Sequence, residues 1–162
     1  MIKYLLFATV TLGGLAVDQA SKIFIYHKMP LHSSIPVIDG LFSITYVRNP
    51  GAAFGMFAQS EWRIPFLTGI TLIALVAIGI AIRNTASHQK LPVLALSLIF
   101  AGAGGNLIDR VRFGEVVDFL DLYWMQHHWP AFNVADSMIC LGVFLYAITN
   151  YVAEKSRKTS PH

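Results

Sequence analysis

The chain is poor in charge and nearly devoid of cysteine. Only 13% of its 162 residues are charged, nine are acidic, and Cys140 is the one cysteine. A single cysteine excludes a disulfide framework. Because no His or basic residue lies near Cys140 in the sequence to activate its thiol, we interpret it as a small hydrophobic residue. A dense basic patch with interleaved aromatic residues is also missing, so the net charge of +3 does not indicate a nucleic-acid partner.

The motifs of metal and serine hydrolases are missing as well. His127 and His128 are adjacent, no His-Glu-x-x-His occurs, and no Cys or Glu stands at ligand spacing from them. Ser137 has no Gly-x-Ser-x-Gly around it. The sequence therefore predicts an activity that uses neither a metal nor a cofactor.

Hydrophobic residues, in contrast, are abundant. They make up 55% of the chain and give a mean hydropathy of +0.56, too apolar for a soluble domain of this size. Four apolar runs are long enough to cross a bilayer core of about 30 Å. They predict a single integral-membrane domain, residues 1–162, that is mainly α-helical with four transmembrane helices. The expected spans are residues 2–26, 64–82, 91–108 and 133–153.

Two longer segments, residues 27–63 and 109–132, separate these spans. Half of the twelve Lys and Arg residues lie on short flanks or in one short loop on the side of the termini, namely Lys3, Arg83, Lys90, Lys155, Arg157 and Lys158. The positive-inside rule acts on such short segments, so we expect both termini in the cytoplasm and the two longer segments outside. Alternation over residues 41–47 predicts a strand, which makes the first of them a small β-rich extracytoplasmic segment on the membrane surface.

Four aspartates cluster from the end of the third span to the start of the fourth. They are Asp109, Asp118, Asp121 and Asp136. An ionised carboxylate at membrane depth costs roughly 3 kcal/mol on insertion scales, so such residues are candidates for function. Two carboxyl groups held together can share one proton and activate a water for amide hydrolysis. We hypothesise an aspartic protease site built from Asp118 and Asp136, while spacing alone leaves other pairings of the four open.

The remaining two aspartates have structural interpretations. Asp109 is expected to form an ion pair with Arg110 or Arg112 at a helix end, and Asp121 is expected to lie on a solvated face. A non-enzymatic alternative is a small transporter or structural subunit that uses carboxylates for ion or proton passage. Because the carboxylates gather at one face and do not step through the bilayer, the pattern argues against such a relay.

Two further pairs have local structural readings. Asp136 stands three residues after Asn133, which is typical of a capped helix start. The start of that helix also favours a negative charge on Asp136, which would leave Asp118 as the protonated partner. Asp18 and Lys22 lie one helical turn apart in the first span, so we expect an ion pair that could also brace a polar site.

Five sequence blocks together resemble a known family. They read Asp18-Gln-Ala-Ser-Lys22, Val47-Arg-Asn-Pro-Gly-Ala-Ala-Phe-Gly55, Gly105-Asn-Leu-Ile-Asp-Arg110, Val116-Val-Asp-Phe119 and Phe132-Asn-Val-Ala-Asp-Ser137. In this order, over nearly the whole chain, they resemble bacterial lipoprotein signal peptidase, also called signal peptidase II.

The resemblance implies an aspartic endopeptidase whose dyad is Asp118 and Asp136. It implies removal of the signal peptide from diacylglyceryl-modified prolipoproteins, with the cut just before the lipid-modified cysteine. Positions expected to line or shape the substrate site are Asn49, Gly51, Asn106, Arg110 and Asn133; those expected to support it are Asp18, Lys22 and Asp109. The expected partners are prolipoproteins, membrane lipids and cyclic peptide inhibitors of the globomycin type. The expected location is the bacterial cytoplasmic (inner) membrane, multi-pass, with the active site at the outer face.

Overall fold

Four long helices and a small sheet make up the protein, in a computed structural model that describes residues 1–51 and 62–159. The helices are α1 (Ile2–Lys28), α2 (Arg63–Asn84), α3 (Lys90–Phe113) and α4 (Val134–Thr159). The strands are β1 (Ser34–Ile38), β2 (Phe42–Asn49), β3 (Val116–Trp124) and β4 (His127–His128), in the order β1-β2-β3-β4 with antiparallel neighbours. The predicted fold class, mainly α with a small β segment, is confirmed.

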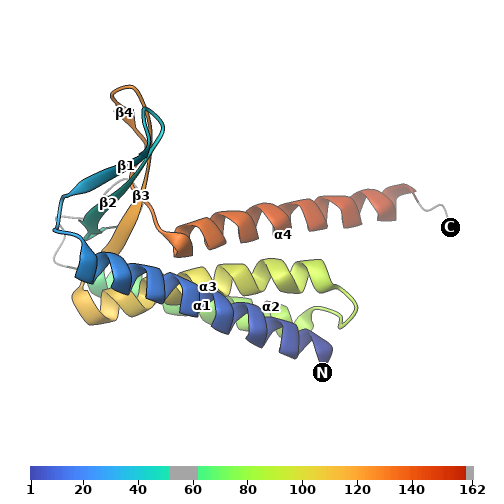
Figure 1. The fold of residues 1–162 in the computed structure, drawn as a ribbon. Helices are drawn as coiled ribbons and strands as arrows, with labels where there is room; N and C mark the ends of the chain where they lie inside the picture. Colours follow the sequence, from blue (N-terminus) through green and yellow to red (C-terminus); the bar gives the residue numbers. More distant parts are fainter. Residues whose placement is uncertain (52–61, 160–162) are drawn as a thin grey trace.

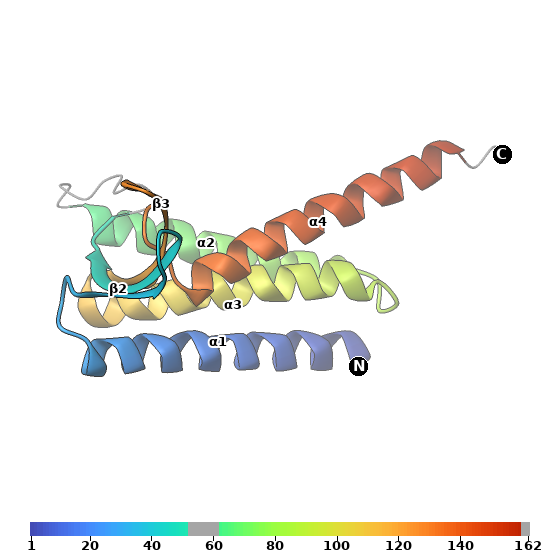
Figure 2. The ribbon, with the colours of Figure 1, turned by 45° about the horizontal axis from the view of Figure 1, so that its top comes forward.

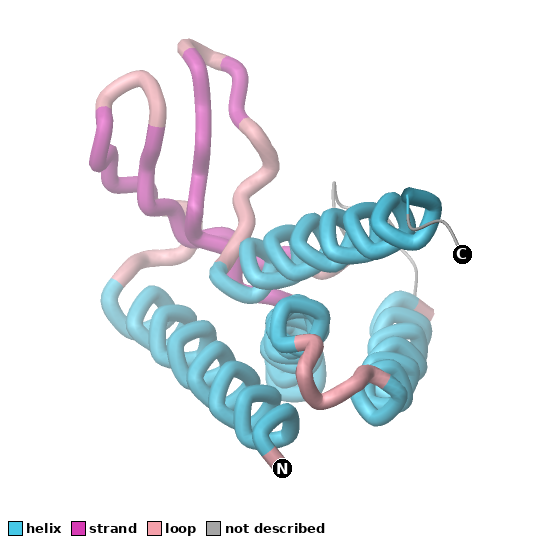
Figure 3. Tube along the Cα trace, turned by 90° about the vertical axis from the view of Figure 1, so that its right-hand side faces the viewer, coloured by secondary structure: helices cyan, strands magenta, loops and turns pink. Residues whose placement is uncertain are grey.

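Helix α3 is the centre of the bundle. Figure 3 looks nearly along the helices and shows α1 and α2 on either side of α3, with α4 lying across it. The sheet stands at one end of the bundle, and both chain termini lie at the other end (Figures 1 and 2). Away from the sheet, α4 diverges from the other helices (Figure 2).

Three helices are long and apolar enough to cross a membrane. Among the described residues these are α2, α3 and the first 22 residues of α4, Val134–Lys155. Helix α1, with 27 residues, has the length but is not among them. Its polar residues, among them Asp18, Gln19 and Lys22, lower its hydropathy, and Asp18 and Lys22 are buried toward the other helices. The span expected at residues 2–26 therefore stays a prediction.

Small residues bring α3 and α4 into backbone contact. A Cβ added at Gly102 would lie 2.3 Å from the carbonyl oxygen of Ala135, and one added at Gly142 would lie 2.7 Å from that of Ala95. These approaches leave no room for a side chain, as expected for small residues at a helix interface in a membrane. The contact places the start of α4 beside the middle of α3.

The sheet is attached to the ends of α1 and α3. Helix α3 ends at Phe113 and is capped by Gly114, whose φ of 71° lies in the left-handed region, and the chain then turns into β3. A buried apolar cluster of Ile25, Met29, Tyr46, Val117 and Phe119 joins the end of α1 to β2 and β3. The sheet is thereby fixed over the end of the bundle.

Strand β2 matches the expected strand, but its burial does not follow the alternation of apolar and polar residues from which the strand was predicted. Ser43 and Thr45 are buried, whereas Phe42 and Ile44 are only half-buried. The pairing of β2 with β3 shifts register between Ile44 and Val47, which interrupts the simple alternation of faces.

Candidate active site

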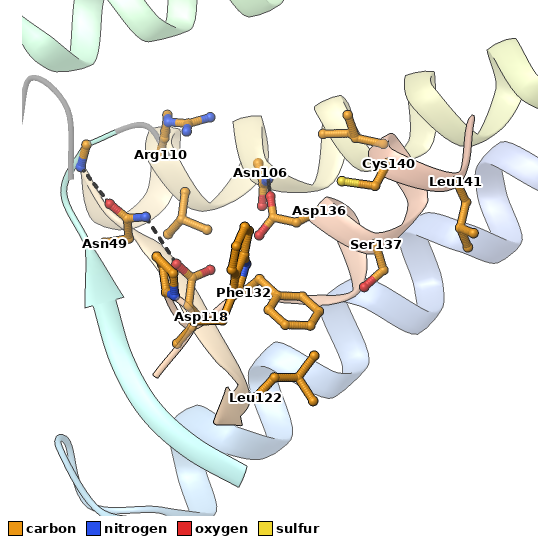
Figure 4. A pocket seen from close by; sticks show the side chains of 16 residues that line it. Asn49, Asn106, Arg110, Asp118, Leu122, Phe132, Asp136, Ser137, Cys140 and Leu141 are labelled. Carbon is orange, nitrogen blue, oxygen red and sulfur yellow. Dashed lines mark hydrogen bonds between the residues drawn. The ribbon is translucent and has the colours of Figure 1, made fainter. Parts of the chain in front are cut away.

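A cavity of about 770 Å³ lies between the sheet, the end of α3 and the start of α4 (Figure 4). Its polar lining includes both hypothesised catalytic residues and four of the expected substrate-site residues, namely Asn49, Gly51, Asn106, Arg110, Asp118 and Asp136. The structure therefore brings together residues from β2, α3, β3 and α4. Residues 52–55 of the second sequence block lie outside the described residues.

Asp118 is held on β3 by two amide donors. Its side chain is buried, at 2% exposed. Oδ1 accepts a hydrogen bond from Asn133 Nδ2 at 2.7 Å, and Oδ2 accepts one from Asn49 Nδ2 at 3.2 Å. Burial and the nearby charge of Asp136 raise the pKa of Asp118 to about 7, against the lowering effect of the two amides and of Lys22. Asp118 therefore holds a proton up to neutral pH.

Asp136 is held on the first turn of α4 by a reciprocal cap. Its backbone N–H donates to Asn133 Oδ1 at 2.9 Å, while the Asn133 backbone N–H donates to Asp136 Oδ2 at 3.1 Å. The cap predicted from the sequence is confirmed. The other carboxyl oxygen, Oδ1, accepts from Asn106 Nδ2 at 2.8 Å. Both oxygens of Asp136 thus accept hydrogen bonds from fixed N–H donors.

Asn133 connects the two carboxyl groups. It is fully buried and does not line the cavity. Its Nδ2 donates to Asp118 Oδ1 and, at 3.1 Å, to Asn106 Oδ1, while its backbone N–H reaches Asp136. One residue therefore bonds to both aspartates and fixes where each sits relative to the other.

Asn49 and Gly51 act together at the cavity edge. The Gly51 N–H donates to Asn49 Oδ1 at 3.0 Å, which turns the amide Nδ2 of Asn49 toward Asp118 (Figure 4). The turn at these residues therefore also directs an amide donor at the carboxyl group of Asp118. Arg110 lines the same cavity, and its positive charge interacts with both Asp118 and Asp136.

A second polar cluster lies behind the cavity, between α1 and α3. The Lys22 Nζ is 3.0 Å from Asp18 Oδ2 and 3.0 Å from Asp109 Oδ2. The expected pairing of Asp18 with Lys22 is confirmed. The expected pairing of Asp109 with Arg110 or Arg112 is wrong, because Asp109 faces α1, where Lys22 supplies its cation.

Hydrogen bonds tie this cluster to the rest of the site. Asp18 Oδ1 accepts from the backbone N–H of Ala135 at 2.9 Å, next to Asp136. Asp109 Oδ2 accepts from the backbone N–H of Val117 at 3.2 Å, next to Asp118. Each acidic residue of the cluster thus holds the backbone beside one cavity aspartate.

Asp121 has a different environment from the one predicted. It is 9% exposed, so the expected solvated face is wrong, and its carboxyl oxygens lie 2.9 and 3.0 Å from His128 Nδ1. The His128 ring stacks on Tyr123. Asp121 closes the β3–β4 hairpin and does not line the cavity.

Sequence reasoning missed the apolar part of the lining. It comprises Val116, Leu122, Trp129, Pro130, Ala131, Phe132, Ile139, Cys140 and Leu141. The residues on α4 carried a usable signal, because Ile139 and Cys140 lie one turn after Asp136 on the same helix face. The residues near Trp129 carried no such signal, because Phe132 is held beside the site by an isolated β-bridge to Leu120, a contact that no local pattern indicates.

Comparison with known proteins assigns the chain to a family. A model of the family described as Signal peptidase (SPase) II matches residues 10–152. The chain belongs to the signal peptidase II family. It is therefore a membrane aspartic endopeptidase of the bacterial inner membrane, and the activity of this family is the cleavage of signal peptides from prolipoproteins.

Relatives and solved structures support the assignment along the whole chain. The lipoprotein signal peptidase of Geobacter metallireducens is 56% identical over 145 residues, 90% of each chain, and that of Geobacter sulfurreducens is 55% identical over 155 residues, 96% of each. Two solved structures described as a bacterial membrane enzyme are similar. One has a TM-score of 0.85 at 35% identity, covering 96% of this chain and 93% of its own; the other has 0.79 at 36%, covering 88% and 90%. The signal peptidase II fold thus accounts for both the bundle and the sheet.

Proposed function

We propose that the chain removes signal peptides from prolipoproteins that carry a diacylglyceryl group on cysteine, cutting just before that cysteine, with Asp118 and Asp136 as the catalytic dyad. The observation that carries this proposal is that both carboxyl groups line one cavity and are joined by Asn133. Two carboxyl groups that share one proton can activate a water for amide hydrolysis without a metal.

The surroundings assign different roles to the two aspartates. Asp136 stands in the first turn of α4, at the positive end of the helix dipole, which favours a negative charge, so we assign it the role of the ionised base. Asp118, whose pKa is raised to about 7, is the protonated acid. Two carboxyl groups that share a proton titrate as a pair, so the protonation state of each aspartate depends on that of the other.

Hydrolysis then proceeds in two balanced steps. Asp136 takes a proton from the water while the water oxygen bonds to the peptide carbonyl carbon. In the same step Asp118 gives its proton to the carbonyl oxygen. In the second step the C–N bond breaks. The amine of the lipid-bearing cysteine receives the proton from Asp136, and Asp118 recovers a proton from a hydroxyl of the tetrahedral intermediate. Both carboxyl groups end in their starting states.

The cavity suits a substrate that is polar at one end and apolar at the other. Asn49, Asn106 and Arg110 surround the aspartates, whereas Leu122 and Leu141 line the apolar part (Figure 4). A peptide that carries lipid arrives from within the bilayer, so an apolar wall beside a polar dyad is the arrangement that it requires. Membrane lipids are accordingly neighbours of this opening, and we expect globomycin-type cyclic peptides to compete for the same cavity.

The site is proposed to face the outside of the inner membrane, with both termini in the cytoplasm. The termini lie at the end of the bundle opposite the sheet (Figure 1), and the short basic segments lie at that same end. Trp124 and Trp129, at the sheet, are 67% and 60% exposed, as suits an interfacial belt. An epitope at residue 162 should be protected from antibody in intact spheroplasts, and one in the turn at residues 125–126 should be reached.

Cleavage by asparagine variants tests the dyad. A diacylglyceryl-modified precursor in detergent is digested by the wild type, Asp118→Asn and Asp136→Asn, with Asp121→Asn as the control outside the cavity. We expect each dyad variant to lower kcat by roughly 10²- to 10⁴-fold and the control to retain most activity. Mass analysis of the product should give the lipid-modified cysteine at its N-terminus, and a precursor without the lipid should be cut poorly. A folded dyad variant that cuts at the wild-type rate would refute the proposal.

A further inference from the structure

Lys22 is bonded to more than its two carboxylate partners. Its Nζ also donates to Asn106 Oδ1 at 2.9 Å, and the side chain is only 2% exposed. An ammonium group has three N–H donors and no acceptor. The bonds to Asp18, Asp109 and Asn106 therefore use all three donors. One of the three goes to a neutral amide, which a purely charge-neutralising lysine would not require.

The bond from Lys22 fixes which way the Asn106 amide points. Since Lys22 can only donate, the atom of Asn106 that faces it must be the oxygen. Asn133 Nδ2 donates to the same oxygen, so both of its lone pairs are occupied. The amide NH₂ of Asn106 is consequently left facing Asp136, whose Oδ1 accepts from it at 2.8 Å.

We propose that Lys22 is a positioning residue for the catalytic dyad: by holding the Asn106 carbonyl it keeps the Asn106 amide donating to Asp136, and so keeps Asp136 oriented and ionised. This inference rests on the proposed function, in which Asp136 is the base. Lys22 does not line the large cavity and so acts through Asn106, without touching substrate.

The acidic partners of Lys22 do not depend on it for all of their hydrogen bonds. Both of its acidic partners have further donors: Gln19 Nε2 donates to Asp18 Oδ2 at 3.1 Å and to Asp109 Oδ1 at 3.0 Å, in addition to the backbone N–H groups described above. The charged groups that face the dyad come from every element packed around it. They are Asp18 and Lys22 on α1, Asp109 and Arg110 on α3, Asp118 on β3 and Asp136 on α4.

A double-mutant cycle between Lys22 and Asn106 tests the proposal. Lys22→Met, Asn106→Leu and the double variant are compared with the wild type for kcat and KM on the lipid-modified precursor. We expect Lys22→Met to lower kcat by roughly 10- to 100-fold in the wild-type background, the size of a lost charge-assisted hydrogen bond, with KM little changed. In the Asn106→Leu background the same change should lower kcat by less than about threefold, because the amide through which Lys22 acts on Asp136 is already absent. Equal losses in both backgrounds would overturn the proposal.

A charge-balanced pair keeps the test valid if Lys22→Met fails to fold. Asp109→Asn alone and together with Lys22→Met are compared, because the double variant retains the net charge of the original cluster, with one anion left. If Lys22 only neutralises charge, the double variant should be as active as Asp109→Asn. If Lys22 positions Asn106, the kcat of the double variant should stay at least about tenfold below that of Asp109→Asn.

The pH profile supplies a readout that a structural role would not move. Because the charge of Lys22 lowers the pKa of Asp118, removing Lys22 should shift the descending limb of kcat/KM to higher pH. A lower amplitude with unchanged limbs would mean a structural role alone. If Asp136→Asn is itself active, the dyad is wrong and the failure belongs to the proposed function; if Asp136→Asn is inactive while the cycle is additive, the failure is that of Lys22 alone.

Discussion

The protein contains two buried clusters of aspartates whose surroundings differ. Behind the cavity, Asp18 and Asp109 share Lys22, and each also holds a backbone N–H. In the cavity, Asp118 and Asp136 receive neutral amide donors, and within the described part of the chain no salt bridge reaches either of them. The first cluster pairs its carboxylates with a cation, whereas in the proposed mechanism the two carboxyl groups of the second share one proton. We therefore expect the ion-paired aspartates, Asp18 and Asp109, to stabilise the fold, and the two without an ion pair among the described residues, Asp118 and Asp136, to take part in the reaction.

Removing an acid from the paired cluster should chiefly cost stability. Asp18→Ala leaves the Ala135 N–H without its partner and takes one of the two anions from Lys22. Breaking a buried ion pair costs about 3–5 kcal/mol, so we expect a large fall in the midpoint of thermal unfolding in detergent, followed by circular dichroism. Activity per folded molecule should fall less than in the dyad variants. A normal unfolding midpoint with abolished activity would place Asp18 in the reacting group instead.

Removing a bridge from the cavity cluster should chiefly cost activity. Asn133→Ser keeps a hydroxyl that can cap α4 but loses the amide that donates to Asp118 and Asn106. The lost partners are the protonated Asp118 and the neutral Asn106 amide, and hydrogen bonds between neutral groups are worth about 0.5–1.5 kcal/mol each, so we expect kcat to fall roughly 10-fold with little change in unfolding midpoint. Asn133→Ala, which removes the cap as well, is the matched comparison and should unfold earlier by about 1 kcal/mol. Equal kcat in Asn133→Ser and the wild type would mean that the bridge is dispensable.

Replacing Asp118, the acid of the dyad, should raise the free energy of unfolding by an amount that depends on pH. The raised pKa of Asp118, about 7, means that the folded state binds its proton more tightly than the unfolded chain does. Stability from this group is present below pH 4 and is lost as pH rises to about 7. Asp118→Asn should therefore be more stable relative to the wild type at pH 8 than at pH 5, by up to about 3 kcal/mol, since the proton's contribution is lost over about two pH units at about 1.4 kcal/mol per unit. The exposed Asp39→Asn is the control and should show no such difference between the two pH values.

Local patterns predicted the contacts that lie within one helical turn, and long-range contacts account for the errors. The Asn133 cap and the Asp18–Lys22 pair join residues within one helical turn, so spacing alone indicates them. Asp109 was assigned to its neighbouring arginines because no local pattern points to Lys22 on another helix. The hydrogen bond from Asn49 to Asp118 crosses 69 residues and depends on the pairing of β2 with β3.

Strand β3 was missed for a related physical reason. Val116, Val117, Asp118 and Phe119 are all buried, so the strand lacks the alternation of apolar and polar residues that indicates a half-exposed strand. The burial of these four residues follows from the packing of β3 against β2 and the end of α1. The family resemblance placed Asp118 in the site, whereas its backbone conformation required the structure.

The central claim is that one carboxyl group of the dyad is ionised while the other is protonated. The most direct test is the pH dependence of kcat/KM of the wild type on a lipid-modified precursor, because this ratio reports the ionisations of the free enzyme. The account predicts a bell-shaped profile whose descending limb has its midpoint near pH 7, where Asp118 loses its proton. A constant kcat/KM from pH 5 to pH 9 would contradict it.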